Sequence, residues 1–344
     1  MGIQLNIYTL LPSPSAMICL GIESTAHTFG VGIVKDKIVL ANVKDLFSTD
    51  TGGIIPSKAA EHHVEVCDSV LDSALREAHL QLKDVNLIAY SRAPGLGHTL
   101  KIGAFAARTL AQLHHKPLIG VNHCIAHLEI GRMLFPECKD PVLLYVSGAN
   151  TQVIAYEGGK YRIFGETLDI GAGNLIDTFA RELGIGFPGG PKIEAMASKS
   201  HSYIELPYVV KGMDVSFGGL LTHLTKMAKS GRYKKEDLCY SLQETIFAML
   251  LEVSERAMAH CGKKELLLGG GVACNSRLQE MAEKMCQERG AKCYVPEKQF
   301  LVDNGAMIAW LGLLMHKAGN RTQIKDSIIK PYERTDDVKV NWRQ

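Results

Sequence analysis

Several patterns that define common protein classes are missing from this 344-residue sequence. No apolar run approaches the roughly 18 to 20 residues of a membrane-spanning helix, so we expect no membrane anchor. The nine cysteines include no Cys-x-x-Cys pair, which argues against a disulfide framework and favours a reducing cytoplasm. The metallopeptidase pattern His-Glu-x-x-His and the phosphate loop Gly-x-x-x-x-Gly-Lys-Ser/Thr are also absent. These absences leave a soluble, globular protein whose chemistry must come from other motifs.

The charge is nearly balanced, with 38 lysines and arginines, 36 aspartates and glutamates, and a net charge of +2. A protein that holds nucleic acid tightly by itself usually has a larger positive excess. Any RNA substrate is therefore expected to need partner proteins for binding. The basic segment 226–235 is interpreted as a solvated surface, with an RNA-facing patch as the alternative.

The segment 121–132 contains His123 and His127, which would share one face of a helix because residues four apart are neighbours there. Two converging imidazoles suit a transition-metal ion. An ordinary pair of helical histidines is the alternative. Because Cys124 follows His123, a metal at this place would lack the glutamate base of the zinc peptidases.

Two segments, 18–40 and 142–164, share one plan of strand, short turn, strand, tight turn and strand. They lie about 125 residues apart, and such a repeat indicates two related lobes with a cleft between them. The turn at 23–28 and its counterpart offer backbone N–H groups and hydroxyls, which are suited to anionic oxygens. A pair of plain β-hairpins is the alternative.

The rest of the chain alternates between strand and helix patterns, which is typical of an α/β architecture. Ser57 is expected to cap the first helix and, on local evidence alone, Asp303 to cap the last one. Glycines 269–271 allow close approach of the backbone to a flat or anionic ligand, or to a helix. The predicted helices are 57–79, 100–115, 171–184, one from 192, 237–260, one ending at 290 and one ending near 319, and the further strands are 85–90, 118–121, 265–268 and 291–295.

Nine short motifs occur over residues 18–310 in the order that one known family has them. Together they resemble the transferases that make threonylcarbamoyladenosine in tRNA, a family formerly described as O-sialoglycoprotein endopeptidases. The resemblance is closest to the archaeal and eukaryotic branch, the catalytic subunit of the KEOPS complex. The motifs are 23–28 (ESTAHT), 94–97 (PGLG), 122–127 (NHCIAH), 145–148 (YVSG), 150–152 (NTQ), 165–169 (GETLD), 188–191 (PGGP), 269–272 (GGGV) and 303–306 (DNGA).

The resemblance implies an α/β, two-lobed fold of the actin and sugar-kinase type, with duplicated β-sheet units and a central cleft. The corresponding division of the chain has an N-terminal extension at 1–16, an N-terminal lobe at 17–138 and a C-terminal lobe at 139–302. The helix 303–320 is expected to pack back on the first lobe, and 321–344 to form a C-terminal tail.

The reaction implied by the resemblance moves a threonylcarbamoyl group from threonylcarbamoyl-AMP to the exocyclic amine of the adenosine 3′ to the anticodon in ANN-decoding tRNAs. The implied partners are tRNA and the KEOPS subunits, including a small protein kinase or ATPase and a small dimerising subunit. Neither a membrane nor DNA is expected as a partner, and the implied location is the cytoplasm.

Carried over residue by residue, the resemblance implies one iron or zinc ion held by His123, His127 and Asp303, which are also the implied catalytic residues. Tyr145 is a fourth candidate ligand, and its phenolate would favour a ferric ion over zinc. The resemblance also implies a site for the donor or for an ATP- or ADP-type nucleotide. That site is formed by Tyr145, Val146, Ser147, Gly148, Ala149, Asp177, Gly190, Glu194 and Asn275.

Four residues depart from the family pattern. Ala149 stands where the family usually has the second glycine of Ser-Gly-Gly-Asn-Thr, and Arg92-Ala93 and His98 flank the Pro-Gly loop unusually. If the turn at Ala149 needs a positive φ, alanine is strained there by about 1 kcal/mol. Three other functions remain as alternatives: a metallopeptidase, as the older family name states, an actin-like ATPase or small-molecule kinase, and a nucleotide-gated scaffold.

Overall fold

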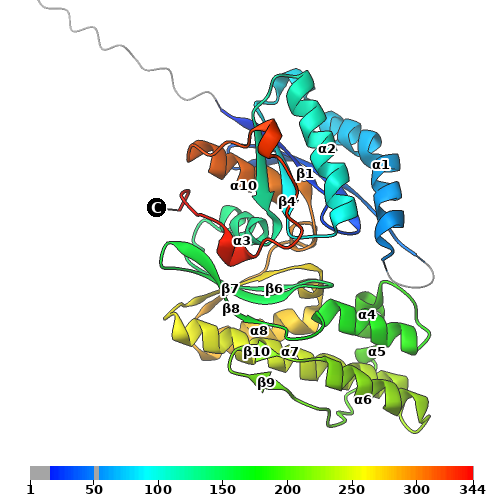
Figure 1. Ribbon diagram of the computed structural model, residues 1–344. Coiled ribbons are helices and arrows are strands. Elements are labelled where there is room, and N and C mark those ends of the chain that lie inside the picture. Colours follow the sequence, from blue (N-terminus) through cyan, green and yellow to red (C-terminus); the bar gives the residue numbers. More distant parts are fainter. Residues whose placement is uncertain (1–15, 50–53, 344) are drawn as a thin grey trace, which may run out of the picture.

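The computed structural model describes residues 16–49 and 54–343. The expected N-terminal extension 1–16 lies, apart from Ala16, outside these residues. Two five-stranded mixed sheets form the centre of the fold (Figure 1), with strand orders β3-β2-β1-β4-β5 and β12-β11-β6-β7-β8. The strands of the two sheets are β1 (Ile18–Glu23), β2 (Thr28–Lys35), β3 (Ile38–Leu46), β4 (Leu87–Ala93), β5 (Leu118–Asn122), β6 (Val142–Val146), β7 (Thr151–Glu157), β8 (Lys160–Glu166), β11 (Glu265–Gly269) and β12 (Lys292–Tyr294), and β9 (Val210–Lys211) pairs separately with β10 (Asp214–Val215).

The two sheets are built on the same plan. In each sheet, three consecutive strands form an antiparallel meander. A later strand pairs in parallel with the first strand of the meander, and one more strand pairs in parallel with that one. Leu20 in β1 therefore lies between Ile33 of β2 and Ile88 of β4. The predicted duplication of 18–40 and 142–164 is confirmed, and the alternative of two unrelated hairpins is wrong.

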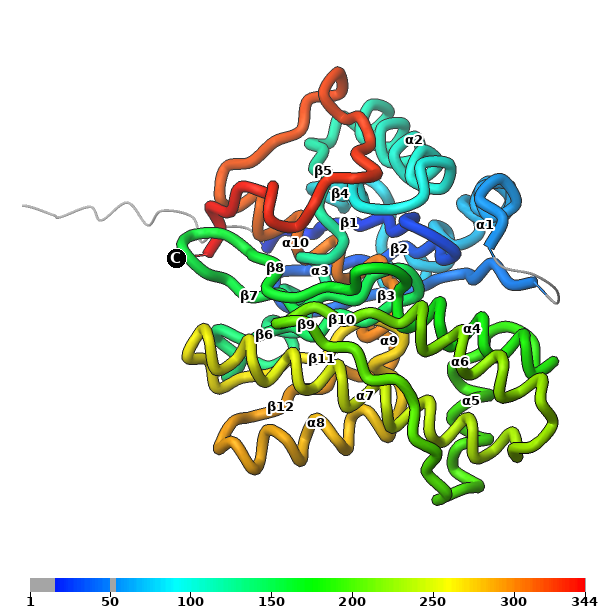
Figure 2. Tube along the Cα trace, turned by 60° about the horizontal axis from the view of Figure 1, so that its bottom comes forward, coloured from blue at the N-terminus to red at the C-terminus, as the bar shows by residue number. Residues whose placement is uncertain are grey.

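The helices cover both sheets, and two of them lie between the sheets (Figures 1 and 2). α1 and α2 lie on the outer side of the first sheet, whereas α3 and α10 share one hydrophobic cluster with residues of both sheets. α7 and α8 pack on the second sheet. The helices are α1 (Pro56–Glu77), α2 (Gly97–Leu113), α3 (His123–Leu134), α4 (Ala172–Glu182), α5 (Gly189–Ala197), α6 (Gly218–Lys229), α7 (Lys235–His260), α8 (Ser276–Glu288), α9 (Lys298–Leu301) and α10 (Gly305–Lys317), with 3-10 turns at Leu82–Asp84, Gly271–Cys274, Ile324–Asp326 and Thr335–Asp337.

The position of α10 explains the small residues in the first sheet. A Cβ atom added to Gly32 would lie 2.1 Å from the backbone nitrogen of Ala306, a distance that real Cβ atoms do not adopt. The N-terminal end of α10 therefore rests directly on the backbone of β2. This close contact fixes the residues immediately before α10, among them Asp303, against the first sheet.

Helix starts are where the sequence-based expectations were least accurate. Ser57 does not cap α1, because the helix begins at Pro56 and Ile55 occupies the cap position without a side-chain bond. Proline suits the first helical position because its fixed φ is already helical and its missing N–H needs no partner there. α5 begins at Gly189 rather than at residue 192. Asp303 does not cap α10 either: the side chain of Asn304 accepts the bond from the Met307 amide, 3.0 Å away.

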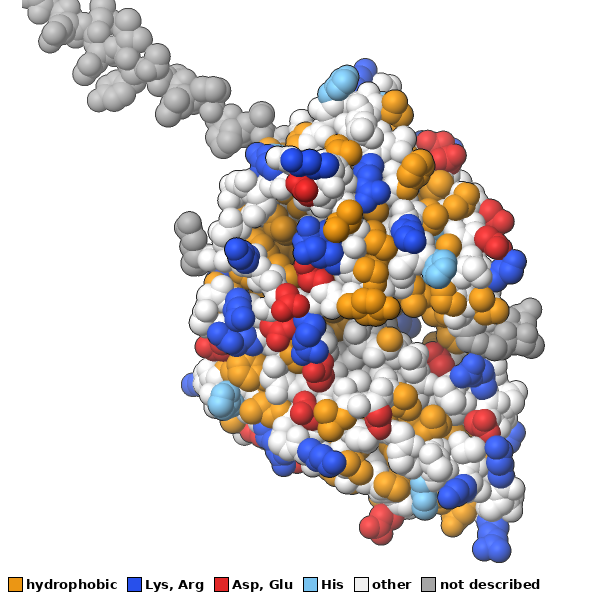
Figure 3. All heavy atoms as spheres, viewed as in Figure 1, with side chains coloured by type: hydrophobic (Ala, Val, Ile, Leu, Met, Phe, Trp, Pro, Cys, Tyr) orange, Lys and Arg blue, Asp and Glu red, His pale blue; other side chains and the backbone are white. Residues whose placement is uncertain are grey.

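The surface carries interspersed charges of both signs, and it is hollowed where the two halves of the molecule meet (Figure 3). The five basic residues of segment 226–235 are all exposed, which fits a solvated surface and equally the alternative of an RNA-facing patch. Within the described residues, none of the helices combines the length and the apolar character that crossing a membrane requires.

Candidate metal centre and nucleotide site

The two histidines of the central motif stand on the first turns of α3. β5 ends at Asn122, whose side-chain oxygen accepts a hydrogen bond from the Ile125 amide at 3.3 Å and so begins the helix. His123 and His127 follow one turn apart, with ring centroids 4.9 Å from each other. Both side chains are buried, with only 3% and 2% of their surface exposed. The predicted helical pair is confirmed.

Asp303 reaches the same point from a distant part of the chain. It lies between α9 and α10, and its Oδ1 atom is 3.3 Å from Nε2 of His123 and 3.5 Å from Nε2 of His127. One ligand atom from each of the three residues lies within 4.8 Å of the other two. Two imidazoles and one carboxylate thus converge on a single buried position.

The chemistry of this cluster fits a metal ion. Among the described residues, neither ring nitrogen of the buried His127 makes a hydrogen bond, and Nε2 has only the 3.5 Å contact with Oδ1 of Asp303. Buried polar atoms without hydrogen bonds are costly, and an ion between Nε2 and Asp303 would give Nε2 a partner. Two imidazoles and one carboxylate are also a ligand set used for iron and zinc, and they leave coordination positions open. The phenol oxygen of Tyr145 lies 3.0 Å from Nε2 of His123, so Tyr145 is placed as a fourth candidate ligand.

The electrostatics of the cluster are strongly coupled. Burial alone would lower the pKa of His123, but the nearby carboxylates of Glu23 and Asp303 outweigh burial and raise that pKa well above its usual range. Burial likewise opposes ionisation of Asp303, yet attraction to His123 holds the pKa of Asp303 well below its usual range. Burial lowers the pKa of His127 and raises that of Tyr145. The carboxylates thus favour a proton on His123, whereas burial opposes one on His127, and a cation would compete with protons at this cluster.

Glu23, at the end of β1, contacts this cluster; it lies in the motif 23–28 but is not among the predicted site residues. Its fully buried carboxylate accepts hydrogen bonds from the amide and hydroxyl of Thr25, at 2.6 and 2.5 Å, and lies 2.9 Å from Nδ1 of His123. A carboxylate on the far nitrogen of a ligand histidine fixes the ring orientation and its tautomer. The contact follows from the strand order β1-β4-β5, which brings the carboxyl ends of β1 and β5 to one edge of the sheet.

The turn between β6 and β7 forms the first part of the candidate nucleotide site, directly after Tyr145 and Val146. Ser147 is held by Asn150, whose carbonyl accepts the Ser147 amide at 2.8 Å. The carbonyl of Gly148 accepts the amide of Asn174 at 2.8 Å, so the turn packs on the start of α4. Ala149 has no positive φ, and the strain considered for this position does not exist.

Asp177 and Gly190 form the second part of this site. Oδ1 of Asp177 accepts the Gly189 amide at 2.7 Å, which joins α4 to the start of α5. Burial raises the pKa of Asp177, although this hydrogen bond opposes the shift. A Cβ atom added to Gly190 would meet no atom within 4 Å, so the surface in front of the α5 start is open.

Glu194 and Asn275 meet at the start of α8. Oε1 of Glu194 accepts bonds from the amide and hydroxyl of Ser276, at 2.8 and 2.6 Å. The side chain of Asn275 caps α8 by accepting from the Arg277 and Leu278 amides. Glu194 and Asn275 therefore both have structural partners. The second carboxylate oxygen of Glu194, and likewise that of Asp177, has no hydrogen-bond partner among the described residues.

Gly270 explains the triple glycine that precedes this region. Its φ is +91°, and a Cβ atom there would lie 2.2 Å from the carbonyl oxygen of Val146. The glycine therefore allows β11 to turn closely past β6. The requirement for glycine at this position comes from close packing on the backbone of β6, and not from the helix packing given as the alternative.

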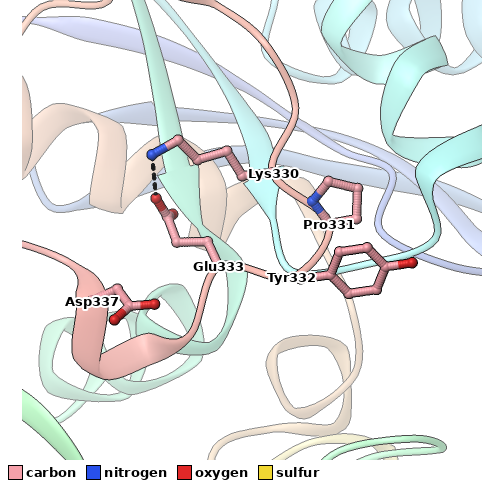
Figure 4. Close-up of a pocket in the computed structure, with 5 residues that line it drawn as sticks. All are labelled: Lys330, Pro331, Tyr332, Glu333 and Asp337. Carbon is pink, nitrogen blue, oxygen red and sulfur yellow. Dashed lines mark hydrogen bonds and ion pairs between the residues drawn. The ribbon is translucent and has the colours of Figure 1, made fainter.

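A surface cavity of about 390 Å³ lies apart from these residues, in the C-terminal tail (Figure 4). Its lining consists of Lys330, Pro331, Tyr332, Glu333 and Asp337. Lys330 and Glu333 form an ion pair at 2.8 Å, and the ring of Tyr332 projects away from them. Since none of the candidate site residues lines this cavity, it is not part of the metal or nucleotide site.

Comparison with known proteins agrees with this architecture. A chain of known structure, component A of the (R)-2-hydroxyglutaryl-CoA dehydratase of Acidaminococcus fermentans, superposes with a TM-score of 0.55 at 14% identity. The match covers 89% of this chain and 100% of that chain, which shows a shared fold. The expected α/β fold with duplicated sheets is confirmed.

Sequence comparison identifies the family. The family model for tRNA N6-adenosine threonylcarbamoyltransferase matches residues 38–310. A protein of that name from Thermococcus kodakarensis is 59% identical over 326 residues, covering 95% of this chain and 100% of the relative. The mouse protein of the same name is 52% identical over 331 residues, covering 94% and 98%. The chain therefore belongs to the tRNA N6-adenosine threonylcarbamoyltransferase family, in a branch with close archaeal and eukaryotic members, and its activity is the transfer of a threonylcarbamoyl group to an adenosine of tRNA.

Proposed function

We propose that the transfer takes place beside a metal centre formed by His123, His127 and Asp303, with threonylcarbamoyl-AMP as donor and the adenosine 3′ to the anticodon as acceptor. The convergence of these three buried side chains from two distant segments carries the proposal. An ion between Nε2 of His127 and Asp303 also explains why this buried nitrogen makes no hydrogen bond and only a 3.5 Å contact with the carboxylate.

The proposed ion is iron or zinc, and Tyr145 is its fourth proposed ligand. When bound, such an ion supplies Lewis-acid stabilisation of developing negative charge. The chain itself orients the ligands: Glu23 holds His123, and the contact between α10 and the first sheet holds Asp303. The ligand side chains are at most 12% exposed, and the low dielectric around buried groups strengthens their charge interactions.

The proposed donor site lies along the turn 147–149 and the starts of α5 and α8. The amides of Gly148 and Ala149 have no partner among the described residues and suit the phosphate oxygens of an adenylate. The remaining oxygens of Asp177 and Glu194 suit the ribose hydroxyls. An ATP- or ADP-type nucleotide would use the same contacts. In the transfer, the adenosine amine bonds to the carbamoyl carbon, the bond from that carbon to the AMP phosphate oxygen breaks, and AMP leaves while the amine loses a proton.

The proposed setting is the cytoplasm, within a KEOPS-type complex that contains a small protein kinase or ATPase and a small dimerising subunit. The near-neutral charge supports this proposal, because the chain has little excess positive charge for binding tRNA alone. We expect the isolated chain to modify little or no tRNA until partner subunits are added. We also propose that the chain divides into an N-terminal lobe at 17–138, a C-terminal lobe at 139–302 and a tail at 321–344.

The test combines elemental analysis with a transfer assay. Anaerobically purified protein is expected to hold about one iron or zinc ion per chain, and His127→Ala to lose both the ion and transfer in the reconstituted complex. The exposed His223 on α6 offers a matched control. His223→Ala also removes an imidazole, but it leaves His123, His127 and Asp303 intact. Full metal content and full transfer in His127→Ala would contradict the proposed centre.

A further inference from the structure

Glu129 is a buried carboxylate on α3, the helix that carries His123 and His127. The proposed chemistry does not use this carboxylate. It lies on α3 two residues after His127 and is only 1% exposed. At 3.6 residues per turn, its side chain leaves the helix on the side roughly opposite the two histidines. A buried carboxylate is costly unless several donors surround it, so its partners indicate what the residue is for.

The partners of Glu129 come from three separate parts of the chain. Arg132, one turn further along α3, donates to Oε2 at 2.7 Å. The hydroxyl of Tyr161 in β8 and the indole N–H of Trp342 in the tail both donate to Oε1, the latter at 3.2 Å. Burial and the adjacent Glu129 carboxylate raise the pKa of Tyr161, so its hydroxyl keeps the proton that it donates.

The backbone of the same residue connects to α10. The carbonyl oxygen of Glu129 accepts the indole N–H of Trp310 at 3.0 Å, and this bond is buried. α10 begins directly after Asp303 and its neighbour Asn304, and Asp303 is the third proposed metal ligand. The residue Glu129 is thus joined both to the helix that follows Asp303 and to the tail.

The end of the tail is seated firmly in this region. The guanidinium of Arg343, with 7% of its side chain exposed, stacks over the ring of Tyr156 at 4.3 Å. It also donates to the carbonyl of Lys139 at 2.8 Å and pairs with Asp140 at 3.2 Å. Figures 1 and 2 show the red tail reaching α3 and the β7–β8 hairpin. The tail therefore spans from the first sheet to the second, beside the metal helix.

The middle of the tail contacts both halves as well. The amide of Lys330 donates to the carbonyl of Arg92 in β4 at 2.9 Å, and Arg334 pairs with Glu166 in β8 at 3.0 Å. Directly after Arg334, Thr335 is buried. These contacts fix the position of the tail relative to both sheets, and so the position of Trp342 relative to Glu129.

We propose that Trp342, bonded to Glu129, is a positioning residue for the metal centre: the tail fixes the rotation of α3, and so the direction in which His123 and His127 face Asp303. This inference rests on the proposed metal function. Helix rotation is the relevant motion because Glu129 and the two histidines project from opposite sides of one helix. Without the indole bond, Tyr161 and Arg132 still satisfy the carboxylate, so the fold survives while the helix gains rotational freedom.

The experiment titrates purified full-length protein with Co²⁺, whose visible absorption reports coordination geometry. Trp342→Phe keeps an aromatic ring but removes the N–H donor. We expect its Co²⁺ affinity to fall by roughly 3- to 10-fold, somewhat less than the 10- to 100-fold typical for direct partners of ligands. We also expect the absorption band to change in shape, while the Tm stays within a few degrees of the wild type.

Tyr332→Phe is the matched control, because Tyr332 is an aromatic residue of the same tail that is 94% exposed. Its Co²⁺ affinity and spectrum should equal those of the wild type. Arg343→Lys is a second test that keeps the charge but removes the planar stacking on Tyr156, and it should act in the same direction if Trp342→Phe fails to fold. A wild-type spectrum and affinity in both Trp342→Phe and Arg343→Lys would overturn the inference. Failure of the wild type itself to bind Co²⁺ would instead overturn the proposed metal centre.

Discussion

The substitution Glu23→Gln tests how the fold prepares His123 for a metal. In the wild type, Oε1 of Glu23 accepts both hydrogen bonds from Thr25, and Oε2 faces Nδ1 of His123 at 2.9 Å. A carboxylate only accepts, so it keeps a hydrogen on Nδ1 and leaves Nε2 to bind an ion. Glutamine has almost the same shape but one donor end, and neither of its orientations both satisfies Thr25 and keeps a hydrogen on Nδ1 of His123.

Each orientation of the introduced glutamine side chain fails at a different contact. With the amide oxygen toward Thr25, the NH₂ group donates to Nδ1 of His123 and moves the ring hydrogen to Nε2, which faces Asp303. With the amide reversed, its NH₂ group meets the backbone N–H of Thr25, a second donor, where the wild-type separation is only 2.6 Å. Loss of such a partner typically reduces metal affinity 10- to 100-fold, or by about 1.4 to 2.8 kcal/mol. The lost charge-assisted bonds also lower the free energy of unfolding by about 1.5 to 3 kcal/mol.

The assay is a competitive titration of Zn²⁺ or Co²⁺ against a chromophoric chelator, followed by threonylcarbamoyl transfer in the reconstituted complex. Asp45→Asn is a matched control, since Asp45 pairs with a different histidine, His62, at 2.8 Å. The control should bind metal as the wild type does. Wild-type metal affinity in Glu23→Gln would refute the view that this carboxylate sets the His123 tautomer.

Three further predictions concern the supporting structure. Gly270→Ala is expected to lower the free energy of unfolding by at least about 2 kcal/mol in urea titrations, because φ is +91° and the methyl group would meet the Val146 carbonyl. Burial opposes ionisation of Asp169, but hydrogen bonds from the amides that begin α6 lower its pKa to about 2. Asp169→Asn should therefore cost about 1 kcal/mol at pH 7, allowing for solvent screening, and the deficit should shrink from about pH 4 to pH 2 as the wild type loses this contribution. Gly190→Leu should fold normally but weaken ADP binding at least about tenfold by calorimetry, because its side chain would fill the open front of α5.

Each of these predictions has a clear contrary result. Gly219→Ala on α6, where a Cβ meets no atom within 4 Å, should keep stability or raise it by up to about 1 kcal/mol, and it is the control for Gly270→Ala. Equal stability of Gly270→Ala and the wild type would show that β11 does not need this close turn. A pH-independent deficit in Asp169→Asn would mean that the carboxylate charge is unimportant. Unaltered ADP affinity in Gly190→Leu would place the nucleotide elsewhere.

The sequence by itself determined the repeated features of this protein. Sequence periodicity predicted the duplicated strand pattern at 18–40 and 142–164 and the helix that carries His123 and His127. It could do so because strand alternation and helical spacing are local properties. The order of short motifs was sufficient for the family. Helix starts were less accessible, since the caps of α1 and α10 depend on which of two neighbouring residues the packed backbone favours, as at Asp303 and Asn304.

Only the tertiary structure decided which distant groups meet. Asp303 joins the histidines because α10 packs on the glycines of the first sheet, and Glu23 reaches His123 because β1 and β5 end at the same edge. The contact between Trp342 and Glu129 likewise spans a sequence separation that no local pattern records. Such contacts depend on how whole sheets and helices pack. The local sequence around a carboxylate or an indole does not indicate which distant residue it will contact.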